Sequence, residues 1–136
     1  MIAEMVGKTV ISAVITHIVK WIANLNRAGN ARKQQSEECL QRVIIAVRKT
    51  AVYCRYLDNG NNPDYVRESD ISCEWTALAL ELEKLKLTAL AKKCRVKGWY
   101  WEDQGRFDEV FLKEAQVSFE HIEKSATILL NAISKS

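Results

Sequence analysis

The sequence has 136 residues, of which 48% are hydrophobic and 27% are charged. That length suits a single domain with its own core, and that composition excludes a disordered tail and a membrane-embedded protein. The formal net charge of +3 permits an anionic partner but is far below that of a dedicated nucleic-acid-binding arm. Five glycines and one proline leave few turns for a many-stranded protein, so we expect residues 1–136 to form one all-helical domain.

The first predicted helix covers residues 2–26. Apolar residues recur at helical spacing on one of its faces, at Val10, Val14, Ile18, Trp21, Ile22 and Leu25. Its centre is apolar, but Lys8, His17 and Lys20 leave it well short of the ~20 apolar residues that a membrane-spanning helix needs. We therefore expect an amphipathic helix of the bundle, with a helix lying on a membrane surface as the less favoured alternative.

The second predicted helix begins between Ala31 and Ser36 and ends near Tyr56. Its core stripe consists of Leu40, Val43, Ile44, Val47, Ala51 and Cys54. The loop 57–64 contains Asn-Gly and Asn-Pro, the strongest helix-breaking pairs in the chain. This loop predicts a hairpin turn between two antiparallel helices.

The third predicted helix is capped by Asp64 or Ser69, since both side chains can accept hydrogen bonds from the free amides of a first helical turn. It extends to Val96 and ends at Gly98, a residue type that commonly terminates helices. The fourth helix covers residues 106–133. Its stripe consists of Phe111, Ala115, Phe119, Ile122, Ala126, Leu129 and Ile133. Four helices with short connections indicate an antiparallel up-and-down four-helix bundle.

The third predicted helix carries two seams on opposite sides. The first seam, which faces the predicted core, consists of Ile71, Trp75, Leu78, Leu82, Leu85 and Ala89. The second consists of Cys73, Ala77, Leu80, Lys84, Leu87, Ala91 and Cys94. At roughly 100° per residue, its centre lies about 165° around the helix from that of the first. Ile45 and Val52 also lie outside the core stripe of the second helix. Because monomers rarely expose contiguous apolar surface, we predict that these residues form a contact between chains.

Lys84 lies in the middle of the second seam and bears on the symmetry of that contact. In a two-fold pairing of the seam, Lys84 would lie close to its own copy, and like charges at an apolar contact are costly. A head-to-tail contact avoids this repulsion and closes into a ring when the rotation allows. The sequence therefore favours a cyclic homo-oligomer of more than two chains over a dimer. The alternative is that a wide bundle buries both seams within one chain.

A second candidate surface combines basic and aromatic residues at one end of the predicted bundle. In an up-and-down bundle, the start of the second helix and the end of the third lie at the same end. The residues gathered there are Arg32, Lys33, Lys92, Lys93, Arg95, Lys97, Trp99 and Trp101. Such a set can bind the phosphates of RNA or DNA and stack on the bases. The alternative is that the cations complement helix dipoles and the rings cover the end of the core.

Neither a metal site nor an active site is indicated. His17 and His121 would lie at similar levels of neighbouring helices, but a metal ion needs three or four converging ligands. The four cysteines form no CxxC pair, and we expect reduced thiols in a cytoplasmic protein. No glycine-rich phosphate loop, nucleophile elbow or HExxH motif is present, so we expect neither a cofactor nor enzymatic activity.

The leading hypothesis from the sequence is a non-enzymatic protein that self-assembles through the second seam and acts as an accessory or scaffold for a larger protein partner. The competing hypothesis is a nucleic-acid-binding accessory protein that uses the basic and aromatic residues around 92–101. Association with a membrane surface through the first helix is the least favoured of the three.

Overall fold

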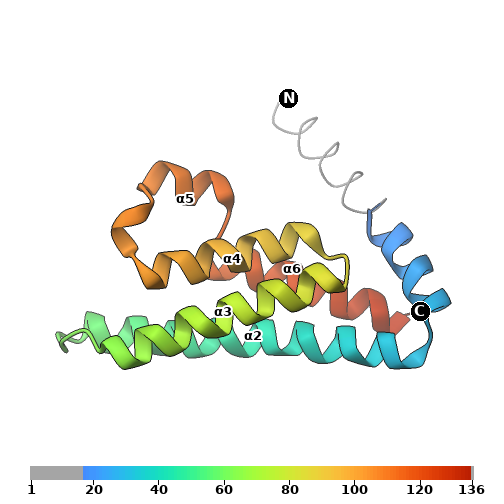
Figure 1. The fold of residues 1–136 in the computed structure, drawn as a ribbon, viewed down its shortest axis with the longest axis horizontal. Helices are drawn as coiled ribbons and strands as arrows, with labels where there is room; N and C mark the ends of the chain where they lie inside the picture. The colour runs from blue at the N-terminus through green and yellow to red at the C-terminus, as the bar shows by residue number, and fades with distance from the viewer. Residues whose placement is uncertain (1–16, 136) are drawn as a thin grey trace.

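The computed structural model describes residues 17–135 of the chain (Figure 1). Residues 17–28 are helical. They are followed by α2 (Asn30–Asp58), α3 (Tyr65–Lys84), α4 (Thr88–Glu102), the 3-10 helix η1 (Gln104–Arg106), α5 (Glu109–Ala115) and α6 (Phe119–Lys135). No strand occurs within residues 17–135, so the predicted all-helical class is confirmed for them. None of these described helices is both long and apolar enough to cross a lipid bilayer.

The first predicted helix is seen only in its second half, because Val10 and Val14 lie outside the described residues. Trp21 and Leu25 are buried, as their spacing predicts. The indole Nε1 of Trp21 donates a hydrogen bond to the carbonyl oxygen of Leu85 at 3.0 Å. This bond fastens the helix of residues 17–28 to the end of α3.

The long helix α2 packs against both α3 and α6 (Figure 1). It begins and ends close to its predicted bounds, and Leu40, Val43 and Val47 of its predicted stripe are buried. Ile44 and Cys54 are only partly buried and pack at the edge of the core. The period of the apolar residues is sufficient to locate this helix, since its buried residues stay on one side from Ser36 to Tyr53.

The predicted hairpin turn joins α2 to α3 and is held by side chains from both. Of the two predicted capping residues, Asp64 caps α3: its carboxylate accepts hydrogen bonds from the backbone N–H groups of Val66 at 3.1 Å and Arg67 at 3.2 Å. The buried Tyr53 hydroxyl accepts a hydrogen bond from the Asp64 N–H at 2.8 Å and donates one to the Glu68 carboxylate at 2.5 Å. Tyr53 therefore satisfies a backbone donor and a buried carboxylate at once.

The prediction of one continuous third helix is wrong. This segment forms two helices, and the chain reverses its direction between them. α3 ends at Lys84, Lys86 has a φ of 66°, and α4 begins at Thr88 and runs back along α3 (Figure 1). In a continuous helix, Leu85 and Leu87 would point about 200° apart, so one of them would face solvent. In the structure each is only 2% exposed. The reversal buries both leucines, and the predicted four-helix up-and-down arrangement is not confirmed.

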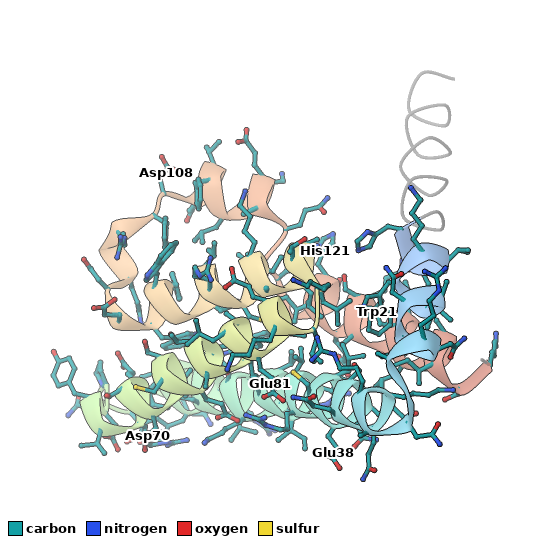
Figure 2. The ribbon with its side chains drawn as sticks, turned by 45° about the vertical axis from the view of Figure 1, so that its right-hand side comes forward. Trp21, Glu38, Asp70, Glu81, Asp108 and His121 are labelled. Carbon is teal, nitrogen blue, oxygen red and sulfur yellow. The ribbon has the colours of Figure 1, made fainter. Side chains whose placement is uncertain are left out.

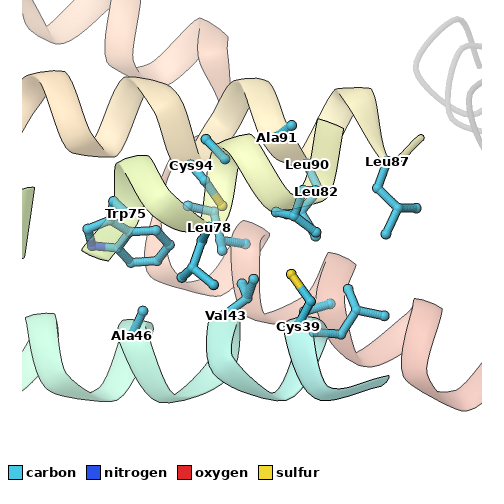
Figure 3. Close-up of a cluster of buried hydrophobic side chains, with 14 of the residues drawn as sticks. Cys39, Val43, Ala46, Trp75, Leu78, Leu82, Leu87, Leu90, Ala91 and Cys94 are labelled. Atoms are coloured by element: carbon cyan, nitrogen blue, oxygen red, sulfur yellow. The ribbon is translucent and has the colours of Figure 1, made fainter. Parts of the chain in front are cut away.

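The core lies where α2, α3, α4 and α6 meet. The side chains labelled in Figure 3 are Cys39, Val43 and Ala46 of α2, Trp75, Leu78 and Leu82 of α3, Leu87 at the turn, and Leu90, Ala91 and Cys94 of α4. The Trp75 indole N–H donates to the Thr50 hydroxyl at 2.9 Å, and this hydroxyl donates to the Ala46 carbonyl at 2.7 Å. The polar atoms of Trp75 and Thr50 are thus satisfied where no water reaches them.

Gly98 does not terminate a helix, contrary to the prediction, but lies buried inside α4 against α3. Its carbonyl accepts a hydrogen bond from the Ser72 hydroxyl at 2.7 Å. A Cβ atom at Gly98 would lie 2.5 Å from the Thr76 hydroxyl and 3.2 Å from the Ser72 carbonyl oxygen. Glycine is therefore required here because the two helices approach too closely for a larger side chain.

The prediction of the fourth helix is wrong for its first half. Residues 103–118 form an arch that contains η1 and the short helix α5, and Gln116 ends α5 with a φ of 53°. Phe111 of the predicted stripe is 42% exposed, and α5 has no buried residue. The second half is confirmed in α6, where the predicted core residues Ile122, Ala126, Leu129 and Ile133 are buried.

We expect Gly98→Val to lower the free energy of unfolding by about 1–3 kcal/mol, because the new side chain would force α4 away from α3. Gly105→Val is the matched control, since the nearest atom to a Cβ at Gly105 lies 3.5 Å away. Urea denaturation followed by far-ultraviolet circular dichroism measures both variants. Equal stabilities of the two would contradict the close approach of α3 and α4.

Candidate functional site

The outer side of α3 carries the exposed part of the predicted second seam. Of that seam, Leu80 is 53% exposed, and Cys73, Ala77 and Lys84 are also exposed. Val66, which the sequence did not assign to the seam, is 72% exposed. With Asp70, which is exposed as well, these residues follow one another at steps of four and three, so they lie on one side of the helix. We call the set Val66, Asp70, Cys73, Ala77, Leu80 and Lys84 the α3 stripe. Figure 2 shows Asp70 near the start of α3 and Glu81 near its end.

Ile45 and Val52 lie on the outer side of α2, where they are 59% and 62% exposed. Two ion pairs bridge the two helices. Arg42 lies 2.6 Å from Glu81, and Lys49 lies 3.0 Å from Glu74. We call the α3 stripe together with Ile45 and Val52 the α2–α3 face. Its apolar side chains are framed by charged residues that belong to the same chain.

Leu87 and Ala91 do not belong to this surface, which corrects their assignment to a contact between chains. They are 2% and 0% exposed, and Cys94 of the same predicted seam is also fully buried. The chain reversal separates the seam into two parts. The part on α3 stays on the surface, while the part beyond Lys84 turns into the core of its own chain.

The predicted basic and aromatic residues are not brought together. Arg32 donates a hydrogen bond to the Lys84 carbonyl, so the start of α2 lies beside the α3–α4 turn, near Lys33, Lys92 and Lys93. Trp101 instead packs edge-on against Tyr53, with ring centroids 5.5 Å apart. Tyr53 follows Arg32 by 21 residues on α2, which is roughly 30 Å at 1.5 Å per residue. The reversal thus carries Trp99 and Trp101 to the opposite end of the molecule.

The other members of that predicted site have partners within the chain. Arg95 forms an ion pair with Glu83 at 2.5 Å. The Arg106 guanidinium lies 4.9 Å from the centre of the Trp99 ring. Trp99 is 38% exposed, and one face of its ring is therefore covered by a cation. This arrangement does not favour stacking of nucleic-acid bases on the predicted residues.

A cavity of about 440 Å³, which the sequence does not predict, lies beneath the arch. It is lined by Cys54, Leu57 and Asp58 of α2, Lys97, Tyr100 and Trp101 of α4, Gln104, Leu112 and Lys113 of the arch, and Val117, Ser118 and Phe119 at the start of α6. Burial lowers the pKa of Lys97, whose ammonium nitrogen lies 4.4 Å from the centre of the Phe119 ring. No single stretch of sequence carries these residues, so no local pattern could have revealed the cavity.

A second cavity, of about 450 Å³, lies between the helix of residues 17–28, the α3–α4 turn and α6. His17 and Ile18 line it together with Leu87, Leu90 and Ile128, so its walls are mostly apolar. His121 lies elsewhere and contacts the Ser118 hydroxyl at 2.6 Å through Nδ1. Within residues 17–135, no group of three or more histidine, cysteine, aspartate or glutamate residues is placed to hold a metal ion.

The four cysteines are free thiols in very different surroundings. Cys39 and Cys94 are 0% exposed, and burial raises the pKa of each to about 12. The nearby Glu81 carboxylate adds to the rise at Cys39. Cys73 is exposed on the α3 stripe. The thiolate is the reactive form, so the two buried thiols are protected both by burial and by their protonation.

No protein-family model matches the chain, and no curated protein or solved structure matches it either. The two features of the described surface that stand out physically are the α2–α3 face, with its exposed apolar side chains, and the cavity beneath the arch, with its half-buried lysine.

We expect Cys39 and Cys94 to contribute a fall in the free energy of unfolding as the pH rises above 9, the ordinary pKa of a thiol. Between that value and about 12, the unfolded chain releases protons from Cys39 and Cys94 that the folded chain retains, so high pH favours unfolding. Each thiol contributes a slope of up to about 1.4 kcal/mol per pH unit. Urea denaturation between about pH 8 and 10, below the titration of most tyrosines, measures this slope.

The double variant Cys39→Ala, Cys94→Ala is expected to have a flatter dependence on pH than the wild-type protein, whatever its absolute stability. Cys73→Ala is the control, because that thiol is exposed before and after unfolding. A slope that both variants share with the wild-type protein would contradict the raised pKa values.

Proposed function

We propose that this protein is a non-enzymatic accessory or scaffold protein that self-assembles through the α2–α3 face. The supporting observation is the exposure of Val66 and Leu80 on α3 beside that of Ile45 and Val52 on α2, each more than half exposed. Full burial of one such side chain contributes roughly 1.5–3 kcal/mol. Covering this face with a second copy would offset a substantial part of the cost of association.

The α3 stripe has the spacing of a contact between two helices. Its steps of four and three residues are those of a coiled-coil seam, which keeps the same side of a helix facing its partner. Cys73 and Ala77 lie in the middle of the stripe and are small, so the backbone of a second helix could approach closely there. Val66 and Leu80 supply larger apolar side chains on either side of this middle.

The charges on the stripe favour an antiparallel two-fold dimer over the predicted ring. Because Leu87 and Ala91 are buried, the exposed stripe ends at Lys84 instead of continuing past it. In an antiparallel pairing centred between Cys73 and Ala77, the two Lys84 side chains would lie at opposite ends, roughly 27 Å apart. Each would lie opposite Val66 of the other copy and about 6 Å along the axis from its Asp70, so that the long lysine side chain could reach an opposite charge.

Leu80→Glu is expected to weaken self-association at least about 10-fold, because a charge would replace an apolar side chain at the contact. Light scattering coupled to size-exclusion chromatography in reducing buffer measures the mass, which would be twice the 15.5 kDa of one chain for a dimer. Val110→Glu is the matched control, since Val110 is 66% exposed on α5, away from the face. A wild-type monomer at high concentration, or equal effects of the two variants, would exclude the proposal.

Reversal of single charges tests the antiparallel register. Asp70→Lys and Lys84→Asp each place like charges together in the proposed dimer and should weaken it about 2- to 10-fold at low salt. The double variant restores opposite charges and is expected to recover most of the lost affinity. Sedimentation equilibrium at low and high salt measures the three variants. Additive losses in the double variant would show that Asp70 and Lys84 do not meet across the interface.

A further inference from the structure

The cavity beneath the arch has mostly apolar walls. Leu57, Leu112 and Val117 supply aliphatic side chains, while Tyr100, Trp101 and Phe119 supply aromatic ones. Its volume of about 440 Å³ falls within the range of natural small-molecule sites. The indole N–H of Trp101 is buried and has no hydrogen-bond acceptor among the described residues.

Lys97 places a cation in these apolar surroundings. The side chain is half-buried, and its ammonium group lies over the Phe119 ring at 4.4 Å. Within residues 17–135, the ion pairs formed at 4.0 Å or less do not include Lys97. The other charged groups that line the cavity, Asp58 and Lys113, are exposed at its edge and have opposite signs. The charged side chains that line the cavity therefore have a net charge of +1, and Lys97 is the half-buried one among them.

The arch contributes to the core through Val117 and also forms one wall of the cavity. α5 contributes no buried residue, yet the arch is defined by specific caps at both of its helical segments. The Asp103 carboxylate accepts a hydrogen bond from the Gly105 N–H at 3.1 Å, and the Asp108 carboxylate accepts one from the Phe111 N–H at 2.7 Å. Phe107 and Phe111 stack with their ring centroids 4.9 Å apart. These contacts hold a wall over the cavity, above α4 in Figure 1.

We propose that this cavity binds a small organic anion with an apolar body, whose acidic group pairs with Lys97 and whose apolar part lies between α4, the arch and the start of α6. An anionic group would replace the hydration that Lys97 loses on burial, which neutral ligands cannot do. The apolar walls would exclude inorganic anions, because these offer nothing to cover the aromatic and aliphatic side chains. The site lies apart from the α2–α3 face and does not depend on self-association.

The fluorescent anion 8-anilinonaphthalene-1-sulfonate is a suitable probe, and N-phenyl-1-naphthylamine is its uncharged counterpart. We expect the wild-type protein to bind the sulfonate saturably with one site per chain. Lys97→Met, which keeps the length of the side chain and removes its charge, should raise the Kd for the sulfonate at least about 10-fold. The same variant should change the Kd for the uncharged counterpart less than about 2-fold.

Lys92→Met is the matched control, since Lys92 is an exposed lysine of the same helix outside the cavity. Leu112→Trp fills the cavity from the short helix α5 and should weaken both probes, with a far-ultraviolet circular dichroism spectrum unchanged. The proposal is overturned if the wild-type protein binds no sulfonate saturably, if Lys97→Met and Lys92→Met have equal effects, or if Leu112→Trp binds both probes as the wild-type protein does.

Discussion

Leu85 and Leu87 are both buried only because the chain turns between α3 and α4, and the rest of the structure depends on that turn. Two other segments are fastened to it. The Leu85 carbonyl accepts a hydrogen bond from Trp21, and the Lys84 carbonyl accepts one from Arg32. The helix of residues 17–28, the start of α2 and the end of α3 therefore meet at one point. Because α4 then runs back along α3, the arch that follows it lies above α4 in Figure 1. The arch lines the cavity together with α4, the end of α2 and the start of α6.

The two proposed binding surfaces use different sides of α2. Val52 lies on its outer side, whereas Cys54, two residues later, lines the cavity. Residues two apart on a helix point about 200° apart, so α2 separates the proposed dimer contact from the proposed ligand. A second copy and an organic anion could therefore be bound at the same time. Any coupling between them would have to pass through the packed side chains of α2, α3 and α4.

The sequence predicts those parts of the fold that rest on local signals. α2, the Asp64 cap and the buried side of α6 follow from helical periodicity and capping chemistry, and the structure confirms them. The α3–α4 turn has no such signal, because residues 84–88 contain neither glycine nor proline. At Gly98 the sequence predicts a helix end that does not exist. Glycine is common after helices, but here a glycine lies inside α4 because α3 approaches it closely. The predicted second seam therefore continues across a turn that only tertiary packing specifies.

The same contrast between local signals and tertiary packing applies to the candidate sites. The sequence predicts Cys73, Ala77, Leu80 and Lys84 of the α3 stripe because they recur on one helix, but not Val66 and Asp70. The assignment of Leu87 and Ala91 is wrong because that helix ends at Lys84. The cavity draws its lining from α2, α4, the arch and α6, which lie far apart in the sequence. The sequence identifies Lys97 only as a member of a basic cluster. Its burial beside Phe119 depends on where α6 begins, which a sequence alone does not establish.

The φ of 66° at Lys86 has a consequence for how the chain folds. A residue with a Cβ atom in the left-handed region costs roughly 1–2 kcal/mol, so the residues of this turn do not favour it by themselves. The reversal becomes favourable once Leu85 and Leu87 can be buried against the other helices. The turn and the burial of Leu85 and Leu87 against the other helices therefore stabilise each other, and neither is favourable without the other.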